Sequence, residues 1–130
     1  MVSSLAQKIK NSSASVAVIG QGYVGLPLAL AIHKAGFFVW GIDSDRKKIA
    51  ALKSSRSYID DVRSEDMADA LKTKRFVPTS SFAPLSKTDV AIIAVPTPLD
   101  KYKIPDLFAV ESATSEIARR IHAEELIILE

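Results

Sequence analysis

Cysteine is absent from the 130-residue sequence, and tryptophan occurs once. The absence of cysteine excludes a disulfide framework, a thiolate zinc site and a cysteine nucleophile within these residues. No apolar run approaches the roughly 18 residues that a membrane-spanning helix needs. Residues 1–14 also lack the sustained apolar stretch and the small-residue cleavage site of a secretory signal. We therefore expect a soluble, cytoplasmic protein with no membrane partner.

A large excess of charge of one sign is also missing. The 17 basic and 15 acidic residues leave a formal net charge of +2, and the basic side chains are scattered among the acids. A nucleic-acid-binding face needs clustered basic residues, so we expect no nucleic-acid partner. The hydrophobic content of 48% is enough to fill one core, which indicates a single domain.

Two acidic pairs, at residues 60–61 and 65–66, are candidate metal ligands. We interpret them as a solvated loop and the first turn of a helix, because acidic side chains stabilise helix N-termini. His33 and His122 have no partner that suggests activation of a nucleophile. We predict neither a metal site nor a catalytic residue from these groups.

Short apolar runs alternate with helical patterns along the chain. Five runs are typical of buried strands, at residues 15–19, 37–42, 76–79, 89–95 and 126–129. Between them, apolar residues recur at helical spacing from residue 24 to residue 35, over 45–53 with Ser44 as a plausible cap, from residue 64 onward, and over 106–121. The alternation predicts parallel strands with helices on both faces of the sheet.

This pattern predicts an α/β fold, a Rossmann-like doubly wound parallel sheet in a single domain over residues 15–130. Residues 1–14 are interpreted as an N-terminal lead-in. The six-stranded version of the fold continues past its fifth strand. We therefore expect the chain to be a fragment of a longer protein, truncated after about the fifth strand.

Three glycines follow the first predicted strand and open the first long helix, in the pattern Gly-x-Gly-x-x-Gly. In a strand-loop-helix context this pattern is the fingerprint of a dinucleotide site. It predicts that Gly20 makes the tight turn, that Gly22 lets the backbone approach a pyrophosphate, and that Gly25 lets the helix pack on the strand. The unpaired N–H groups around Tyr23 and Val24 would then face the phosphate charge.

Asp43 ends the second predicted strand, where the fingerprint places an acid. We expect its carboxylate to accept hydrogen bonds from the adenosine ribose and to repel a 2′-phosphate, which predicts NAD rather than NADP. Arg46, Lys47 and Lys48 follow closely and weaken this inference, because a basic residue can serve a 2′-phosphate.

Three other interpretations stay open. The glycines are compatible with a tight turn that binds no ligand. An S-adenosylmethionine-dependent methyltransferase also uses a glycine loop and an acid after its second strand, although its usual glycine spacing is tighter. A non-catalytic domain that senses NAD or regulates through it is the third.

Four longer stretches carry a family resemblance. They are VIGQGYVGLPLA at 18–29, GIDSD at 41–45, VPTPL at 95–99 and PDL at 105–107. From Val16 to Glu130 the chain resembles the N-terminal NAD-binding domain of the UDP-glucose/GDP-mannose dehydrogenase family. The Thr-Pro-Leu turn and the short loop into Pro-Asp-Leu are most similar to the branch of UDP-N-acetylglucosamine and UDP-N-acetylmannosamine 6-dehydrogenases.

The resemblance implies an NAD-dependent enzyme that oxidises the C6 alcohol of a UDP-sugar, a UDP-N-acetylhexosamine in this branch, to the uronic acid with two NAD, for polysaccharide biosynthesis. It also implies that Asp43 and Lys48 bind the adenosine ribose and that Thr97 lies beside the cofactor. The full set of expected cofactor-binding residues is Gly20, Gly22, Tyr23, Val24, Gly25, Asp43, Lys48, Val95, Pro96 and Thr97.

Residues 16–130 resemble only the N-terminal domain of the family. The family's catalytic residues, central helix and C-terminal substrate domain lie in a later region. We therefore expect no catalytic residue in this chain, an inactive fragment, a UDP-sugar bound mostly by the missing part, and a full-length homodimer or higher oligomer. Phe108 stands where the family usually has serine, and the resemblance assigns no role to it or to residues 100–104, including Tyr102.

Overall fold

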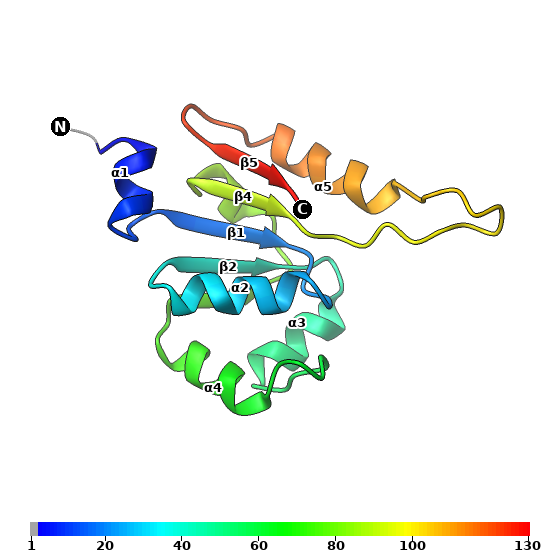
Figure 1. Cartoon of the computed structure of the whole chain (residues 1–130), viewed down its shortest axis with the longest axis horizontal. Helices are drawn as coiled ribbons and strands as arrows, with labels where there is room; N and C mark the ends of the chain where they lie inside the picture. Colours follow the sequence, from blue (N-terminus) through cyan, green and yellow to red (C-terminus); the bar gives the residue numbers. More distant parts are fainter. Residues whose placement is uncertain (1–2) are drawn as a thin grey trace.

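The computed structural model describes residues 3–130 and contains a five-stranded parallel sheet (Figure 1). The sheet has the order β3-β2-β1-β4-β5, as predicted for a doubly wound fold. Its strands are β1 (Ser15–Ile19), β2 (Phe38–Ile42), β3 (Phe76–Thr79), β4 (Val90–Ile93) and β5 (Leu126–Leu129). The chain runs outward from β1 to β3 and then returns to place β4 on the other side of β1, so the strand order reverses between β1 and β4.

Helices cover both faces of the sheet (Figure 1). They are α1 (Leu5–Lys10), α2 (Gly25–Lys34), α3 (Arg46–Lys53), α4 (Ser64–Lys72), α5 (Phe108–Ala118) and the short 3₁₀ helix η1 (Ala83–Ser86). Because successive strand side chains point to opposite faces, Val16 and Val18 join one core with α2, α3 and α4, whereas Ala17 and Ile19 join another with α5 and η1. Within residues 3–130 no helix is long and apolar enough to cross a membrane.

Part of the predicted lead-in is helical. The side chain of Ser4 accepts a hydrogen bond from the Gln7 amide, and the Gln7 side chain accepts one from the Ser4 amide, which forms a capping box at the start of α1. Leu5 packs against the core, and Lys8 Nζ lies 2.9 Å from Asp89 Oδ1. The Ser-x-x-Gln pattern was therefore a usable signal for a helix that the sequence analysis did not predict.

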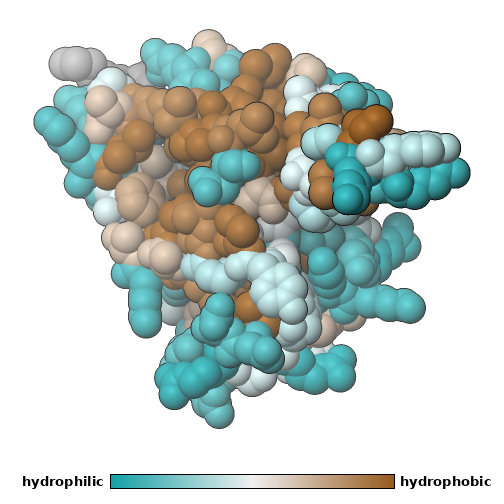
Figure 2. All heavy atoms as spheres, turned by 45° about the vertical axis from the view of Figure 1, so that its right-hand side comes forward, coloured by the Kyte–Doolittle hydropathy of each residue, from teal (hydrophilic) through white to brown (hydrophobic). Residues whose placement is uncertain are grey.

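The strand β5 is present at the predicted residues, but the prediction that it is buried is wrong. All four of its residues are exposed, with Leu129 at 66%, because β5 lies at the edge of the sheet and pairs only with β4 in the described structure. Figure 2 turns the right-hand side of Figure 1 forward and shows a broad hydrophobic area on this side of the molecule.

The bounds of other elements differ from the predictions by a few residues. Asp45, rather than Ser44, caps α3, and its side chain accepts hydrogen bonds from the amides of Lys47 and Lys48. The helix predicted over 106–121 is shorter, since it begins at Phe108 after a turn that Asp106 closes by accepting a hydrogen bond from the Phe108 amide.

Candidate functional site

A cleft of about 430 Å³ opens at the carboxyl ends of β1 and β4, where the strand order reverses. Ligands of doubly wound sheets bind at this position. The cleft is lined by Gly20, Gly22, Tyr23, Val24, Asp43, Lys48, Ala94, Val95, Pro96, Thr97 and Glu130. Nine of the ten predicted cofactor-binding residues are in this lining, and the tenth, Gly25, lies buried beneath the loop.

The three glycines of the loop are required for different reasons. Gly20 has a φ of +100°, and a Cβ there would lie 2.6 Å from the carbonyl oxygen of Ala94. A Cβ on Gly25 would overlap the carbonyl oxygen of Gly20. A Cβ on Gly22 would have no atom of the described chain within 4 Å. Packing within the chain thus explains Gly20 and Gly25, whereas the open space at Gly22 lies on the wall of the cleft and suits the close approach of a ligand.

The start of α2 offers free hydrogen-bond donors to the cleft. The N–H groups of Gly22, Tyr23 and Val24 make no hydrogen bond within the described residues, and Val24 provides no side-chain cap. Regular helical bonding begins with the Leu26 amide, which donates to the Gly22 carbonyl at 3.1 Å. Unpaired amides at a helix N-terminus, together with the helix dipole, form an anion site.

Asp43 is held rigidly beside these amides. Its Oδ2 accepts a hydrogen bond from the Gln21 amide at 2.8 Å, and its Oδ1 accepts one from the Asp45 amide at 2.8 Å. Each carboxylate oxygen keeps capacity for a further donor. Lys48 lines the same wall, with its Nζ 5.9 Å from the ring centroid of Tyr58. The structure therefore brings an anion site, a fixed carboxylate and an ammonium group to one cleft.

Gln21, within the glycine loop, is a structural residue that the sequence analysis missed. It is fully buried, and its Nε2 donates to the carbonyl oxygens of Val18 at 2.9 Å and Gly20 at 3.2 Å. The side chain fits because Gly41 has no Cβ, since an added Cβ would lie 2.8 Å from Gln21 Oε1. A glycine inside an apolar strand often marks such a close approach, so Gly41 was an available signal.

Tyr58 was also missed. It lies between α3 and α4, outside any predicted element, and its hydroxyl donates to the Gln21 carbonyl at 2.6 Å. Burial and the nearby carboxylates of Asp43 and Asp45 raise the pKa of Tyr58, so the phenol stays protonated and remains a donor. Tyr58 thereby ties the middle of the glycine loop to a segment far away in the sequence, and no pattern in the sequence predicts that contact.

A second pocket, of about 300 Å³, continues the cleft past Asp43. It shares Gly20, Asp43, Lys48, Val95 and Pro96 with the cleft, and its far side is formed by Ile19, Ser44, Phe82, Phe108, Ala109, Ser112 and Ala113. The cleft and this pocket are therefore adjacent, and their linings reach from the start of α2 to the start of α5.

The arm formed by residues 98–106 extends away from the sheet (Figure 1). Leu99 and Pro105 form an isolated antiparallel bridge, and the Asp100 amide donates to the Ile104 carbonyl at 2.8 Å. Tyr102 is 71% exposed, and neither the cleft nor the second pocket includes it in its lining. In this structure Tyr102 is a surface aromatic and does not cover the cleft.

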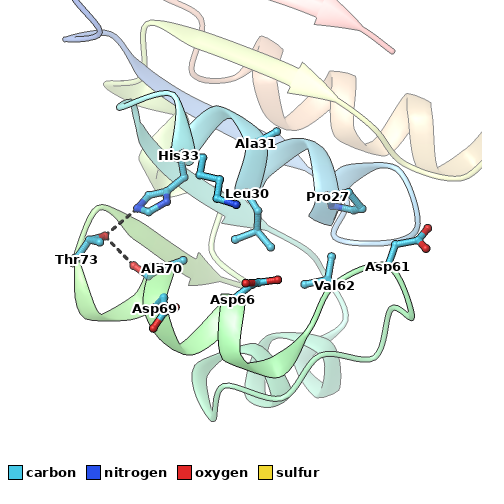
Figure 3. A pocket seen from close by; sticks show the side chains of 11 residues that line it. Pro27, Leu30, Ala31, His33, Asp61, Val62, Asp66, Asp69, Ala70 and Thr73 are labelled. Carbon is cyan, nitrogen blue, oxygen red and sulfur yellow. Dashed lines mark hydrogen bonds between the residues drawn. The ribbon is translucent and has the colours of Figure 1, made fainter.

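Another groove, of about 400 Å³, lies between α2 and α4 (Figure 3). The Thr73 hydroxyl donates to the Ala70 carbonyl at 2.7 Å, so His33 Nε2, 2.8 Å away, is the donor to Thr73. Burial and the charge of Arg75 lower the pKa of His33. Residues 3–130 hold no cluster of three or more metal-ligating side chains. We therefore interpret the hydrogen bond between His33 and Thr73 as part of the packing of α2 against α4.

Comparison with known proteins gives one consistent result. The sequence profile described as "UDP-glucose/GDP-mannose dehydrogenase family, NAD binding domain" matches residues 14–130. The UDP-N-acetyl-D-glucosamine 6-dehydrogenase of Pseudomonas aeruginosa is 36% identical over 115 residues, which are 88% of this chain and 26% of that protein. The UDP-N-acetyl-D-mannosamine dehydrogenase of Escherichia coli (strain K12) is 34% identical over 123 residues, 92% of this chain and 28% of that protein.

A solved structure agrees with these relatives. The structure of UDP-D-ManNAc dehydrogenase from Pyrococcus horikoshii superposes with a TM-score of 0.82 and 30% identity, covering 89% of this chain and 28% of the other. The chain therefore spans about a quarter of the length of these three relatives.

Proposed function

The chain belongs to the UDP-glucose/GDP-mannose dehydrogenase family, whose NAD-binding domain it matches over residues 14–130, and from this premise we propose that its cleft holds NAD as part of a nucleotide-sugar 6-dehydrogenase. The relatives that carry UDP-N-acetylhexosamine dehydrogenase names support a UDP-N-acetylhexosamine as the substrate class. The proposed reaction of the whole protein is oxidation of the sugar C6 alcohol to the uronic acid with two NAD.

The convergence of free amides and a fixed carboxylate on one cleft carries the proposal. The amides of residues 22–24 would donate hydrogen bonds to the pyrophosphate, and Gly22 would leave room for it. Asp43, whose two oxygens are already oriented by backbone amides, would accept hydrogen bonds from the adenosine ribose hydroxyls. Thr97 would lie on the nicotinamide side of the cleft, and the lining of the second pocket would receive the adenine.

The bound cofactor supplies a hydride acceptor, and the residues of this chain bind and orient it. No residue of the chain is assigned a proton transfer or a covalent step. We propose that the substrate-binding and catalytic groups belong to the other three quarters of the length that the relatives have. The proposal includes a homodimer or higher oligomer for the whole enzyme and a location in the cytoplasm.

The test is Asp43→Asn in the 130-residue chain, with NAD and NADP affinities measured by calorimetry. Hydrogen bonds to a charged group contribute about 1.5–3 kcal/mol, so NAD affinity should fall about 10- to 150-fold. The preference for NAD over NADP should shrink, since the repulsion of the 2′-phosphate is removed. Asp69→Asn is the matched control, because Asp69 is an exposed acid on α4 that lines the other groove.

Absence of NAD binding by the unaltered chain, or an unchanged cofactor preference in Asp43→Asn, would refute the proposal. Formation of NADH by the 130-residue chain with a UDP-sugar would refute the assignment of the catalytic groups to residues outside it.

A further inference from the structure

Phe108 is a large aromatic side chain that lies at a pocket without being buried there. It is 75% exposed and is the first residue of α5. It lines the second pocket together with Phe82 and Pro96. We propose that Phe108 is the platform on which the adenine of the cofactor stacks. This inference rests on the proposed function and adds a specificity-determining residue to it.

The position of the ring is fixed by the local structure of the chain. The Phe108 amide donates to Asp106 Oδ1 at 2.9 Å, which sets the residue at which α5 begins. On the inner side of the helix, Ala113 and Ile117 are buried against the sheet. Phe108 is therefore anchored through its backbone, while its ring remains free to contact a ligand.

The order of groups in a dinucleotide places the adenine at this ring. Asp43 lines both the cleft and the second pocket, so a ribose bound to Asp43 lies at their junction. The phosphates leave this ribose toward the amides of residues 22–24, and the base therefore leaves it toward the second pocket. There the base finds Val95 and Pro96 as apolar neighbours and Phe108 at the rim. A flat, exposed aromatic ring is a suitable stacking partner for a purine.

The test is a set of Phe108 variants in the 130-residue chain, titrated with NAD and with ADP-ribose, which retains the adenosine but lacks nicotinamide. Phe108→Ser removes the ring, Phe108→Leu keeps apolar volume without aromaticity, and Phe108→Tyr keeps the ring. Base–aromatic stacking corresponds to about 5- to 150-fold in affinity. We expect a loss in this range for both ligands in Phe108→Ser, a smaller loss in Phe108→Leu, and nearly full affinity in Phe108→Tyr.

Tyr102→Ser is the matched control, because Tyr102 is a similarly exposed aromatic, at 71%, that lines neither part of the site. Thermal unfolding of each variant reports whether the fold is intact, and the high exposure of Phe108 predicts little change. Equal affinities in Phe108→Ser and the unaltered chain overturn this inference and leave the proposed function standing. An unaltered chain that binds neither ligand overturns both.

Discussion

At the scale of single residues, packing within the chain requires the two outer glycines of the loop, whereas the middle one leaves open space on the wall of the cleft, where we propose that the cofactor binds. Gly22 lacks a positive φ and has an empty Cβ position, so alanine fits there without strain. Gly25 does not have this freedom, because its Cβ would overlap the Gly20 carbonyl.

Gly22→Ala should therefore weaken NAD binding at least about tenfold, by obstructing the pyrophosphate, and leave the unfolding temperature nearly unchanged. Gly25→Ala should lower the free energy of unfolding by about 1–3 kcal/mol, since overpacking against backbone is relieved only by moving the helix. Calorimetric titration and thermal unfolding of both variants check this contrast. Equal destabilisation by the two substitutions would contradict it.

Tyr58 acts on the loop through the Gln21 carbonyl. Tyr58→Phe removes the 2.6 Å hydrogen bond and leaves that acceptor less well satisfied. We expect a loss of about 1 kcal/mol in unfolding free energy and a roughly threefold to tenfold loss in NAD affinity.

Titration with NAD and urea unfolding measure the two effects separately. Tyr102→Phe, on the exposed arm, should change neither quantity. A Tyr58→Phe variant that is less stable but binds NAD normally would show that the phenol supports the fold without orienting the loop.

At the scale of elements, Asp89 joins α1, β1 and β4 at their shared end. Its Oδ1 accepts from Lys8 Nζ at 2.9 Å, and its Oδ2 accepts from the Ser15 amide at 2.9 Å. Burial disfavours the charged carboxylate, but the hydrogen bonds from Ser15 and Lys8 outweigh it and hold the pKa of Asp89 below its ordinary value.

A carboxyl group whose pKa is lower in the folded chain stabilises the fold above its unfolded pKa, near 4, and loses this effect as the pH falls through the folded value. Asp89→Asn should thus lower the unfolding free energy by about 1.5–3 kcal/mol at pH 7. The difference from the unaltered chain should shrink below about pH 4. Urea unfolding of both chains from pH 7 to below about pH 4 measures this difference in unfolding free energy. A difference that does not change with pH would contradict the role of the Asp89 charge.

The strands could be predicted from the sequence because each is a short apolar run, and β1 and β4 are also buried along almost their whole length. The apolar runs of β1 to β5 and the glycine loop each carry a local signal. The exposure of β5 has no such signal, because an edge strand and a central strand of the same composition differ only in their neighbours. Tyr58 was unpredictable for the same reason, since its contact with Gln21 joins residues 37 apart in the sequence.

At the scale of the whole molecule, β5 is an unprotected edge strand of the sheet in residues 3–130. Its side chains are Leu, Ile, Ile and Leu, all at least 36% exposed, and they lack the lysine or proline that commonly blocks strand-to-strand association. Figure 2 shows a broad hydrophobic area on the side of the molecule that it turns forward.

The 130-residue chain should therefore self-associate as its concentration rises. Leu129→Lys, at the most exposed position of β5, should reduce this association with little loss of stability. Light scattering over a concentration series measures it. The control is Leu99→Lys on the arm, where the side chain is 62% exposed. If both substitutions reduce association equally, the added charge acts by raising solubility in general and the edge of β5 is not the cause of the association.

Asp89 and Asp43 lie at opposite ends of β1, since Asp89 bonds to the Ser15 amide at its start and Asp43 bonds to the Gln21 amide after its end. We expect the contacts of Asp89 to contribute to the free energy of unfolding, and we propose that Asp43 selects the nucleotide. Substitutions for a different coenzyme can therefore be made at the Asp43 end. Any unfolding free energy lost there can be offset by strengthening the contacts of Asp89 at the other end.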